Sequence, residues 1–285
     1  MNLAELWDHL KQETMGLVGV GLLLFFIFVA VFAPWLAPYD PFETNYRADG
    51  SLARMDPPSS SHWFGTTRLG RDVFSQVIMG SRVAVITGLS CAIVVATVGT
   101  VMGLTAGYYG GRVDDILMRL ADIAYGVPFL PFGIILVAIL GPSLRNIIIA
   151  IVAISWRTTS RVVRSEVLSL RSRAFIEAAR VSGASDLRII FHHLAPNVLP
   201  ITLVYTALAM GWAIMTEASL SFLGYGDPML WSWGKILFSS YVAQAMNVAW
   251  WWVVPPGLFI ALFTMSGFLI SRSVEEIVNP RLRRL

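Results

Sequence analysis

The sequence predicts an all-α protein that crosses a membrane six times, with both termini in the cytoplasm. Two features of the composition indicate a membrane protein: 56% of the 285 residues are hydrophobic and only 14% are charged. Soluble domains average about 45–50% apolar and about 25% charged residues. The third observation is a series of long charge-free runs, because a bilayer core of about 30 Å needs about 20 apolar residues in one helix.

The expected membrane spans follow from these runs. They are residues 15–36, a span between Arg82 and Arg112, a span between Asp122 and Arg145, a span that starts from residues 146–156, and spans near 198–216 and 250–270. Pro128 and Pro131 interrupt the third span, which is therefore expected to be bent or broken. In the second span, Gly99, Gly103 and Gly107 fall on one helix face, where another helix can approach closely.

The fourth expected span is the shortest, since only residues 146–156 are free of charge. It can extend far enough to cross if Arg157 and Arg161 either snorkel to the membrane surface or face a protein interior. The residues themselves leave both options open.

The distribution of basic residues predicts the orientation. With the N-terminus inside, fourteen of the 21 Lys and Arg residues fall on the cytoplasmic side, as the positive-inside rule expects. The chain then divides into three parts. Residues 1–82 hold an N-terminal cytoplasmic segment, the first span and an outer loop; residues 83–271 form a core of five spans; and residues 272–285 form a cytoplasmic tail.

Residues 157–196 form the expected cytoplasmic loop between the fourth and fifth spans. Residues 172–182 are rich in alanine, which predicts a short helix, and Gly183 would end it. Ser185 or Asp186 can cap a second helix that runs toward the fifth span. Two helices joined at a glycine corner form a rigid shape on which another protein could dock. A solvated loop that only obeys the topology is the alternative.

This loop resembles a known motif. The triplet Glu-Ala-Ala at 177–179, followed by Gly183, is similar to the opening of the EAA loop of ABC importer permeases. The closing half departs from that pattern, because His193 and Ala195 stand where the family has an aliphatic residue and a leucine. Three other stretches are similar to dipeptide, oligopeptide and nickel permeases: residues 64–72 (FGTTRLGRD), 217–224 (EASLSFLG) and 279–281 (NPR). The chain thus resembles the second, C-type permease subunit of such importers.

The resemblance implies a type I ABC importer permease fold, a place in the cell (inner or cytoplasmic) membrane and a set of partners. A homologous second permease would complete the pore, two ABC ATPases would bind beneath it, and an extracytoplasmic binding protein would deliver short peptides. ATP and Mg would belong to the ATPases, and this chain would hold no cofactor. The residues implied to couple to the ATPases are Glu177, Ala178, Ala179, Ser182, Gly183 and Asp186.

The sequence has no motif for ATP binding and hydrolysis. A phosphate-binding loop needs two glycines, a lysine and a serine or threonine at fixed spacing, and neither Lys11 nor Lys235 lies in one. The four histidines do not have the spacing of metal ligands. We therefore expect a transport subunit with no catalytic residues and no metal, not an enzyme.

Glu217 and Ser219 lie at the outer end of the fifth expected span. A carboxylate near membrane depth is a candidate functional group, so these two residues could line a translocation pathway. Glu217 could equally cap the helix that follows, or pair with an arginine of a partner chain.

Other functions remain as alternatives. An oligosaccharide or nickel could be the solute of the same machinery. A self-sufficient secondary transporter would typically show inverted repeats and intramembrane ionisable groups, and these spans show no convincing repeat and few acidic residues. An intramembrane enzyme is disfavoured because no nucleophile or metal constellation is present.

Overall fold

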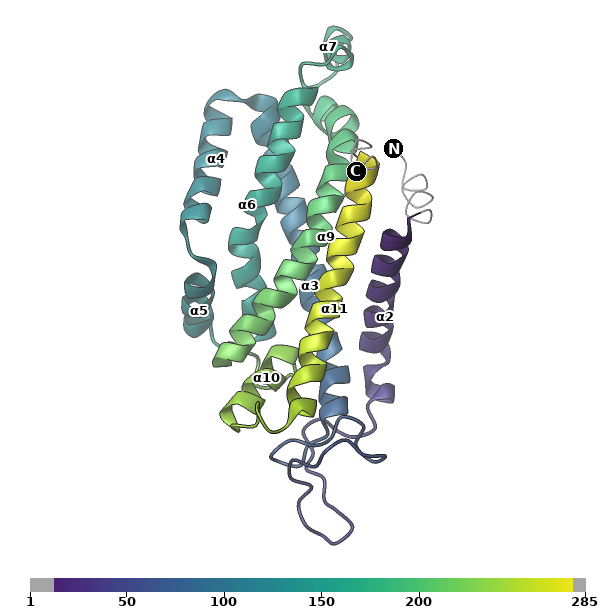
Figure 1. Ribbon diagram of the computed structural model, residues 1–285. Helices are drawn as coiled ribbons and strands as arrows, with labels where there is room; N and C mark the ends of the chain where they lie inside the picture. Colours follow the sequence, from purple (N-terminus) through teal and green to yellow (C-terminus); the bar gives the residue numbers. More distant parts are fainter. Residues whose placement is uncertain (1–12, 279–285) are drawn as a thin grey trace.

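The computed structural model describes residues 13–278, which fold into a bundle of long helices (Figure 1). The predicted all-α class is confirmed for these residues. In chain order the helices are α2 (Thr14–Leu36), α3 (Val73–Tyr109), α4 (Gly111–Gly126), α5 (Phe129–Leu140), α6 (Leu144–Leu170), α7 (Ala174–Val181), α8 (Asp186–Arg188), the π-helix η1 (Ile189–Leu194), α9 (Ala195–Leu220), the π-helix η2 (Ser221–Tyr225), α10 (Trp233–Val242) and α11 (Trp250–Val278).

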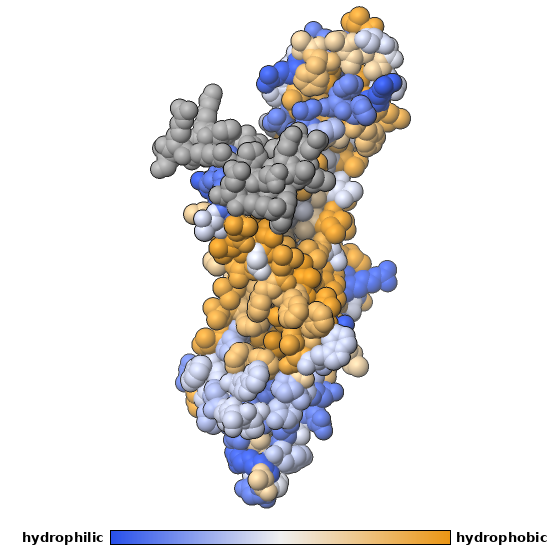
Figure 2. All heavy atoms as spheres, turned by 90° about the vertical axis from the view of Figure 1, so that its right-hand side faces the viewer, coloured by the Kyte–Doolittle hydropathy of each residue, from blue (hydrophilic) through white to orange (hydrophobic). Residues whose placement is uncertain are grey.

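Five helices of the described chain are long and apolar enough to cross a membrane: α2, α3, α6, the continuous run from α8 to η2, and α11. Helices α4 and α5 provide a sixth crossing if this bent pair counts as one span. On the face that Figure 2 shows, hydrophobic residues cover the middle of the molecule and hydrophilic residues gather toward its two ends. The described chain therefore has five candidate spans, or six with the bent pair, and the predicted number of six stays a prediction.

The predicted break in the third span is confirmed. Helices α4 and α5 meet at an angle of 89°, and the break falls at Val127 and Pro128. Proline disfavours helical geometry in the residue before it, which explains the break. Pro131 lies in the first turn of α5, where its missing N–H costs nothing.

The glycines of α3 lie against α6, as their spacing predicted. A methyl group added at Gly99 would stand 2.6 Å from the Thr159 Cβ, and one added at Gly107 would stand 2.7 Å from the Val167 Cβ. Only glycine permits this approach, because real side chains do not tolerate such distances. Helix α6 also forms an ion pair with α4: Nε and Nη2 of Arg164 each donate at 2.5 Å to a carboxylate oxygen of Asp114.

Helix α6 accommodates its arginines by contact with protein. The guanidinium groups of Arg157 and Arg161 lie 4.7 and 4.0 Å from the centre of the Tyr125 ring in α4, and Arg161 also pairs with Asp122. Both arginines thus contact α4, although Arg161 remains exposed, and the choice between snorkelling and a protein interior stays a prediction. Because α6 continues to Leu170, the first part of the expected loop 157–196 is helical rather than irregular.

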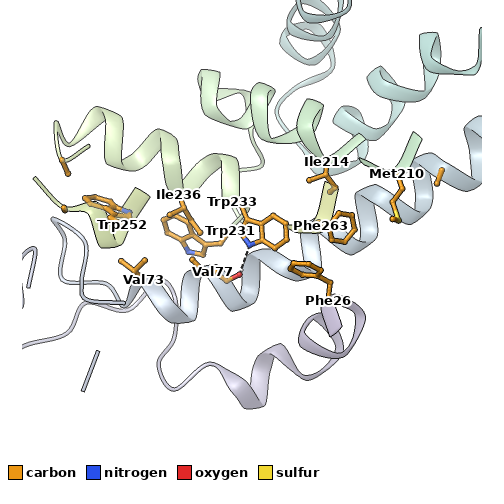
Figure 3. Close-up of a cluster of buried hydrophobic side chains, with 14 residues drawn as sticks. Phe26, Val73, Val77, Met210, Ile214, Trp231, Trp233, Ile236, Trp252 and Phe263 are labelled. Carbon is orange, nitrogen blue, oxygen red and sulfur yellow. Dashed lines mark hydrogen bonds between the residues drawn. The ribbon is translucent and has the colours of Figure 1, made fainter. Parts of the chain in front are cut away.

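Helix α10 was not predicted, and Figure 3 shows why it belongs to the core. The Trp233 ring is buried against Phe26 of α2 and Phe263 of α11, with ring centres 5.6 and 6.1 Å away. Its Nε1–H donates to the Val77 carbonyl of α3 at 2.9 Å. Gly80 leaves room for the indole, because a methyl group there would lie 2.8 Å from it. One tryptophan thus fastens α10 to three long helices.

Helix α2 begins, and α11 ends, at the same end of the bundle as α7, while residues 37–72 lie at the opposite end (Figure 1). This arrangement agrees with an even number of crossings. Lys11 and the basic residues Arg281, Arg283 and Arg284, which contribute to the predicted orientation, lie outside the described residues, as does the motif at 279–281. The side of the membrane on which α7 lies stays a prediction.

Candidate functional site

The first candidate site is the elbow, residues 174–188, which projects from one end of the bundle (Figure 1). Helix α7 ends at a glycine corner, where the N–H of Gly183 donates to the Arg180 carbonyl at 2.9 Å and the N–H of Ala184 donates to the Ala179 carbonyl at 3.0 Å. Gly183 has a φ of +80°, the left-handed conformation that commonly ends a helix and favours glycine. The predicted helix stop is confirmed.

The second half of the elbow begins at a serine cap. The Ser185 hydroxyl accepts a hydrogen bond from the N–H of Arg188 at 3.4 Å, and the helix then runs without interruption through η1 into α9. All six residues expected to couple to an ATPase lie in the elbow: Glu177, Ala178, Ala179, Ser182, Gly183 and Asp186. Ala179 is half-buried, and the other five are exposed.

One fully buried side chain anchors α7 to the bundle. Ile176 is 0% exposed and belongs to a cluster with Val163 and Val167 of α6 and Ile189 of η1. An isolated helix of eight residues is not stable in water, so α7 depends on this contact. Burial of an isoleucine contributes about 1.5–3 kcal/mol.

Polar contacts fasten the elbow to the end of α3. The Tyr108 hydroxyl donates to the Asp186 carboxylate at 2.7 Å, and the Arg180 guanidinium lies 5.6 Å from the centre of the Tyr108 ring. Arg171 donates to the carbonyls of Gly107 and Tyr108 at 3.1 and 3.3 Å, which lie in the last turn of α3 and lack partners within that helix. The sequence reasoning missed Tyr108 and Arg171, because nothing in their local pattern links them to residues about 70 positions away.

The elbow also presents large apolar side chains that the sequence reasoning did not single out. Val181 is 90% exposed and Leu187 is 64% exposed, and Phe191 of η1 is exposed one turn after Leu187. Exposed apolar groups gathered on one projection mark an interaction surface. The four-residue spacing of Leu187 and Phe191 on one helix face was the available signal.

The second candidate site is a cavity of about 620 Å³ between α5, α6 and α9. Ser219 and Thr216 of α9 line it, together with Arg157 of α6. Glu217 does not line this cavity. It is buried in the protein and accepts a hydrogen bond from the Ser221 hydroxyl of η2 at 2.6 Å.

The structure therefore separates the two residues that were expected to act together. Ser219 lies in the cavity wall, whereas Glu217 faces the helix that follows it. Of the three roles considered for Glu217, a cap at the start of a following helix is not observed, because Glu217 lies within α9 and its carboxylate accepts from the Ser221 hydroxyl one turn later. A pathway role and pairing with an arginine of a partner chain stay predictions. Arg157 lines the cavity as well, and the sequence reasoning considered it only for its effect on helix length.

Long apolar helices, a projecting elbow and a cavity between the helices together define a multi-pass membrane transport protein. Residues 99–284 match the family model described as the binding-protein-dependent transport system inner membrane component. Residues 2–58 match the N-terminal transmembrane domain of oligopeptide transport permease C. The chain belongs to this family of inner membrane transport components, and it is a multi-pass protein of the cell membrane.

Relatives with assigned names agree with the family models. The chain is 38% identical to the dipeptide transport system permease protein DppC of Alkalihalophilus pseudofirmus, over 98% of this chain and 90% of the relative. It is 36% identical to the oligopeptide transport system permease protein OppC of Bacillus subtilis, over 96% of this chain and 88% of the relative. It is 34% identical to the glutathione transport system permease protein GsiD of Pectobacterium atrosepticum, over 98% of this chain and 91% of the relative.

A solved structure supports the fold. The inward-facing MetNI methionine ABC transporter contains a chain that superposes with a TM-score of 0.54 at 18% sequence identity, over 70% of this chain and 96% of that chain. At this identity the likeness concerns the fold alone. It agrees with the type I ABC importer permease fold that the sequence resemblance implied.

Proposed function

We propose that this chain is one of two permease subunits of an ATP-driven importer of short peptides. A homologous permease completes the pore, an extracytoplasmic binding protein delivers the peptide, and two ABC ATPases bind below the membrane and hold ATP and Mg. The relatives named for dipeptide and oligopeptide transport support the solute class. In this proposal the chain itself hydrolyses nothing and binds no cofactor.

We propose further that the elbow is where the ATPases act on this chain. The observation that carries this proposal is a short helix fixed to the bundle by Ile176 that still exposes Glu177 and the apolar Val181 to its surroundings. A helix that is packed against the bundle on one face and exposes apolar side chains on the other can bind a partner and transmit the partner's motion to the bundle. A flexible solvated loop could do neither.

The test is a pair of substitutions in the elbow, measured in the assembled importer in proteoliposomes. Gly183→Pro forces a φ near −65° on a position that has +80°, and so destroys the corner. Glu177→Lys reverses an exposed charge without changing the fold. Glu166→Lys in α6 is the matched control, because Glu166 is also exposed but lies outside the elbow.

Both elbow variants are expected to insert normally, to keep ATP hydrolysis in the complex, and to lose peptide uptake. The control is expected to transport like the unmodified protein. Normal peptide uptake by both elbow variants would contradict the coupling role. Import of nickel or an oligosaccharide, with no import of peptides, would replace the proposed solute class and leave the coupling role standing.

A further inference from the structure

Arg157 is a charged residue in the wall of the cavity with no carboxylate partner. It lies near the middle of α6, which is long and apolar enough to cross a membrane, and an ionisable side chain in such a helix marks a functional site by default. Within residues 13–278, no Asp or Glu forms an ion pair with it. Arg161, one turn further along the helix, does have such a partner in Asp122.

The local charges do not balance. Two guanidinium groups, those of Arg157 and Arg161, lie over the single ring of Tyr125, and Asp122 neutralises only one of them. Arg157 donates from Nη1 to the Ile154 carbonyl at 2.5 Å, while its buried Nε has no hydrogen-bond partner. One positive charge is therefore left without a carboxylate among the described residues.

The cavity has the size and chemistry to supply that carboxylate from a ligand. Arg157 is the one charged residue among those that line it in the described chain, and the hydroxyls of Ser155 and Thr158 lie in the same wall. Tyr205 and Trp212 contribute aromatic surface on the side of α9. A cavity of about 620 Å³ falls within the range of about 300–1,000 Å³ typical of small-molecule sites.

We propose that Arg157 binds the C-terminal carboxylate of a peptide during its passage through the permease. A planar guanidinium matches a carboxylate in shape and charge, and every unmodified peptide carries this group whatever its side chains. Such a contact recognises a peptide without selecting its sequence. This inference rests on the proposed function, because it names the part of the peptide that the cavity recognises.

The test compares two peptides in the assembled importer in proteoliposomes that hold ATP. One is trialanine with a free C-terminus and the other is trialanine amide, and the measured quantity is the ratio of their uptake rates. Arg157→Gln is expected to lower this ratio by about tenfold or more, which corresponds to about 1.4 kcal/mol. The ratio cancels any preference of the binding protein, because the same binding protein serves each variant.

Two further variants complete the test. Arg145→Gln removes an exposed arginine in the first turn of the same helix and is expected to leave the ratio unchanged. Arg157→Lys keeps the charge without the planar fork, and is expected to give an intermediate ratio. It also provides the measurement if the glutamine variant does not assemble.

An unchanged ratio in Arg157→Gln, with normal assembly, overturns the inference. Equal loss of both peptides, together with loss of the second permease on purification, also overturns it, since Arg157 would then pair with a carboxylate of that subunit. If the unmodified importer moves neither peptide, the proposed peptide function itself fails, and this result is distinct from the other two.

Discussion

Substitution of Ile176 by alanine tests whether a single buried contact holds α7 in place. The side chain is fully buried among residues of α6 and η1, so its truncation leaves a space that its neighbours can only partly fill. Loss of a buried isoleucine typically costs about 2–5 kcal/mol. Ile93→Ala is the control, because Ile93 of α3 is 62% exposed and its truncation removes little packing.

We expect this cost to weaken the attachment of α7 to the bundle, because Ile176 is the buried side chain that α7 contributes to the cluster. The polar contacts of the elbow with α3 are weaker. The Tyr108–Asp186 hydrogen bond involves an exposed carboxylate and contributes about 1 kcal/mol, and the Arg180 guanidinium lies near the Tyr108 ring. A loss of about 2.8 kcal/mol shifts the balance between attached and detached α7 about a hundredfold. Since α7 is too short to persist alone, we expect the detached form to lose its helix.

The assay uses the assembled importer in nanodiscs, in which both membrane faces are accessible. Limited trypsin digestion should cut faster after Arg180 in Ile176→Ala, because proteases cleave opened segments. The same variant in proteoliposomes should import less peptide for each ATP hydrolysed. Unchanged cleavage together with unchanged uptake per ATP would refute the view that Ile176 anchors the elbow.

Two other substitutions test the packing around the elbow. Gly103→Ala places a methyl group 2.6 Å from the Ser160 carbonyl oxygen and should cost about 1–3 kcal/mol, measured as a lower melting temperature in detergent. Gly21→Ala is the control and should not lower the melting temperature, because nothing lies within 4 Å of the added methyl group. Equal melting temperatures of the two variants would contradict the close approach of α3 and α6. Tyr108→Phe removes the hydrogen bond to Asp186 and should lower uptake per ATP less than Ile176→Ala does. If Tyr108→Phe lowers uptake per ATP by the same factor in an Asp186→Ala background, the Tyr108–Asp186 hydrogen bond is not the cause of the loss.

The long apolar elements could be predicted because membrane spans depend on local composition. The first span was expected at residues 15–36 and is Thr14–Leu36, and the break at Pro128 follows from the geometry of proline. The glycine face of α3 was also predictable, although its partner α6 was not. Four-residue glycine spacing indicates a close approach but does not identify the helix that approaches.

The remaining features depend on contacts between distant parts of the chain. Helix α10 has no membrane-length apolar run, and it is fixed by the distant residues Phe26 and Val77 around Trp233. In the same way, the elbow corner could be predicted from Gly183, whereas its attachment through Ile176 could not. The local sequence predicts the secondary structure of a segment, whereas the contacts that fix the segment to the rest of the protein are seen only in the tertiary structure.

The elbow and the cavity share one structural element, the packed pair of α3 and α6. Val167 of α6 packs with Ile176 in the elbow cluster, and two turns earlier Thr159 both lines the cavity and contacts Gly99 of α3. Helices in such close contact resist sliding past one another, because every glycine position would meet a side chain. In the proposed mechanism, a displacement of the elbow therefore moves the cavity wall with it, and the Arg157 side chain on the same helix moves relative to α9 and to any peptide bound between them.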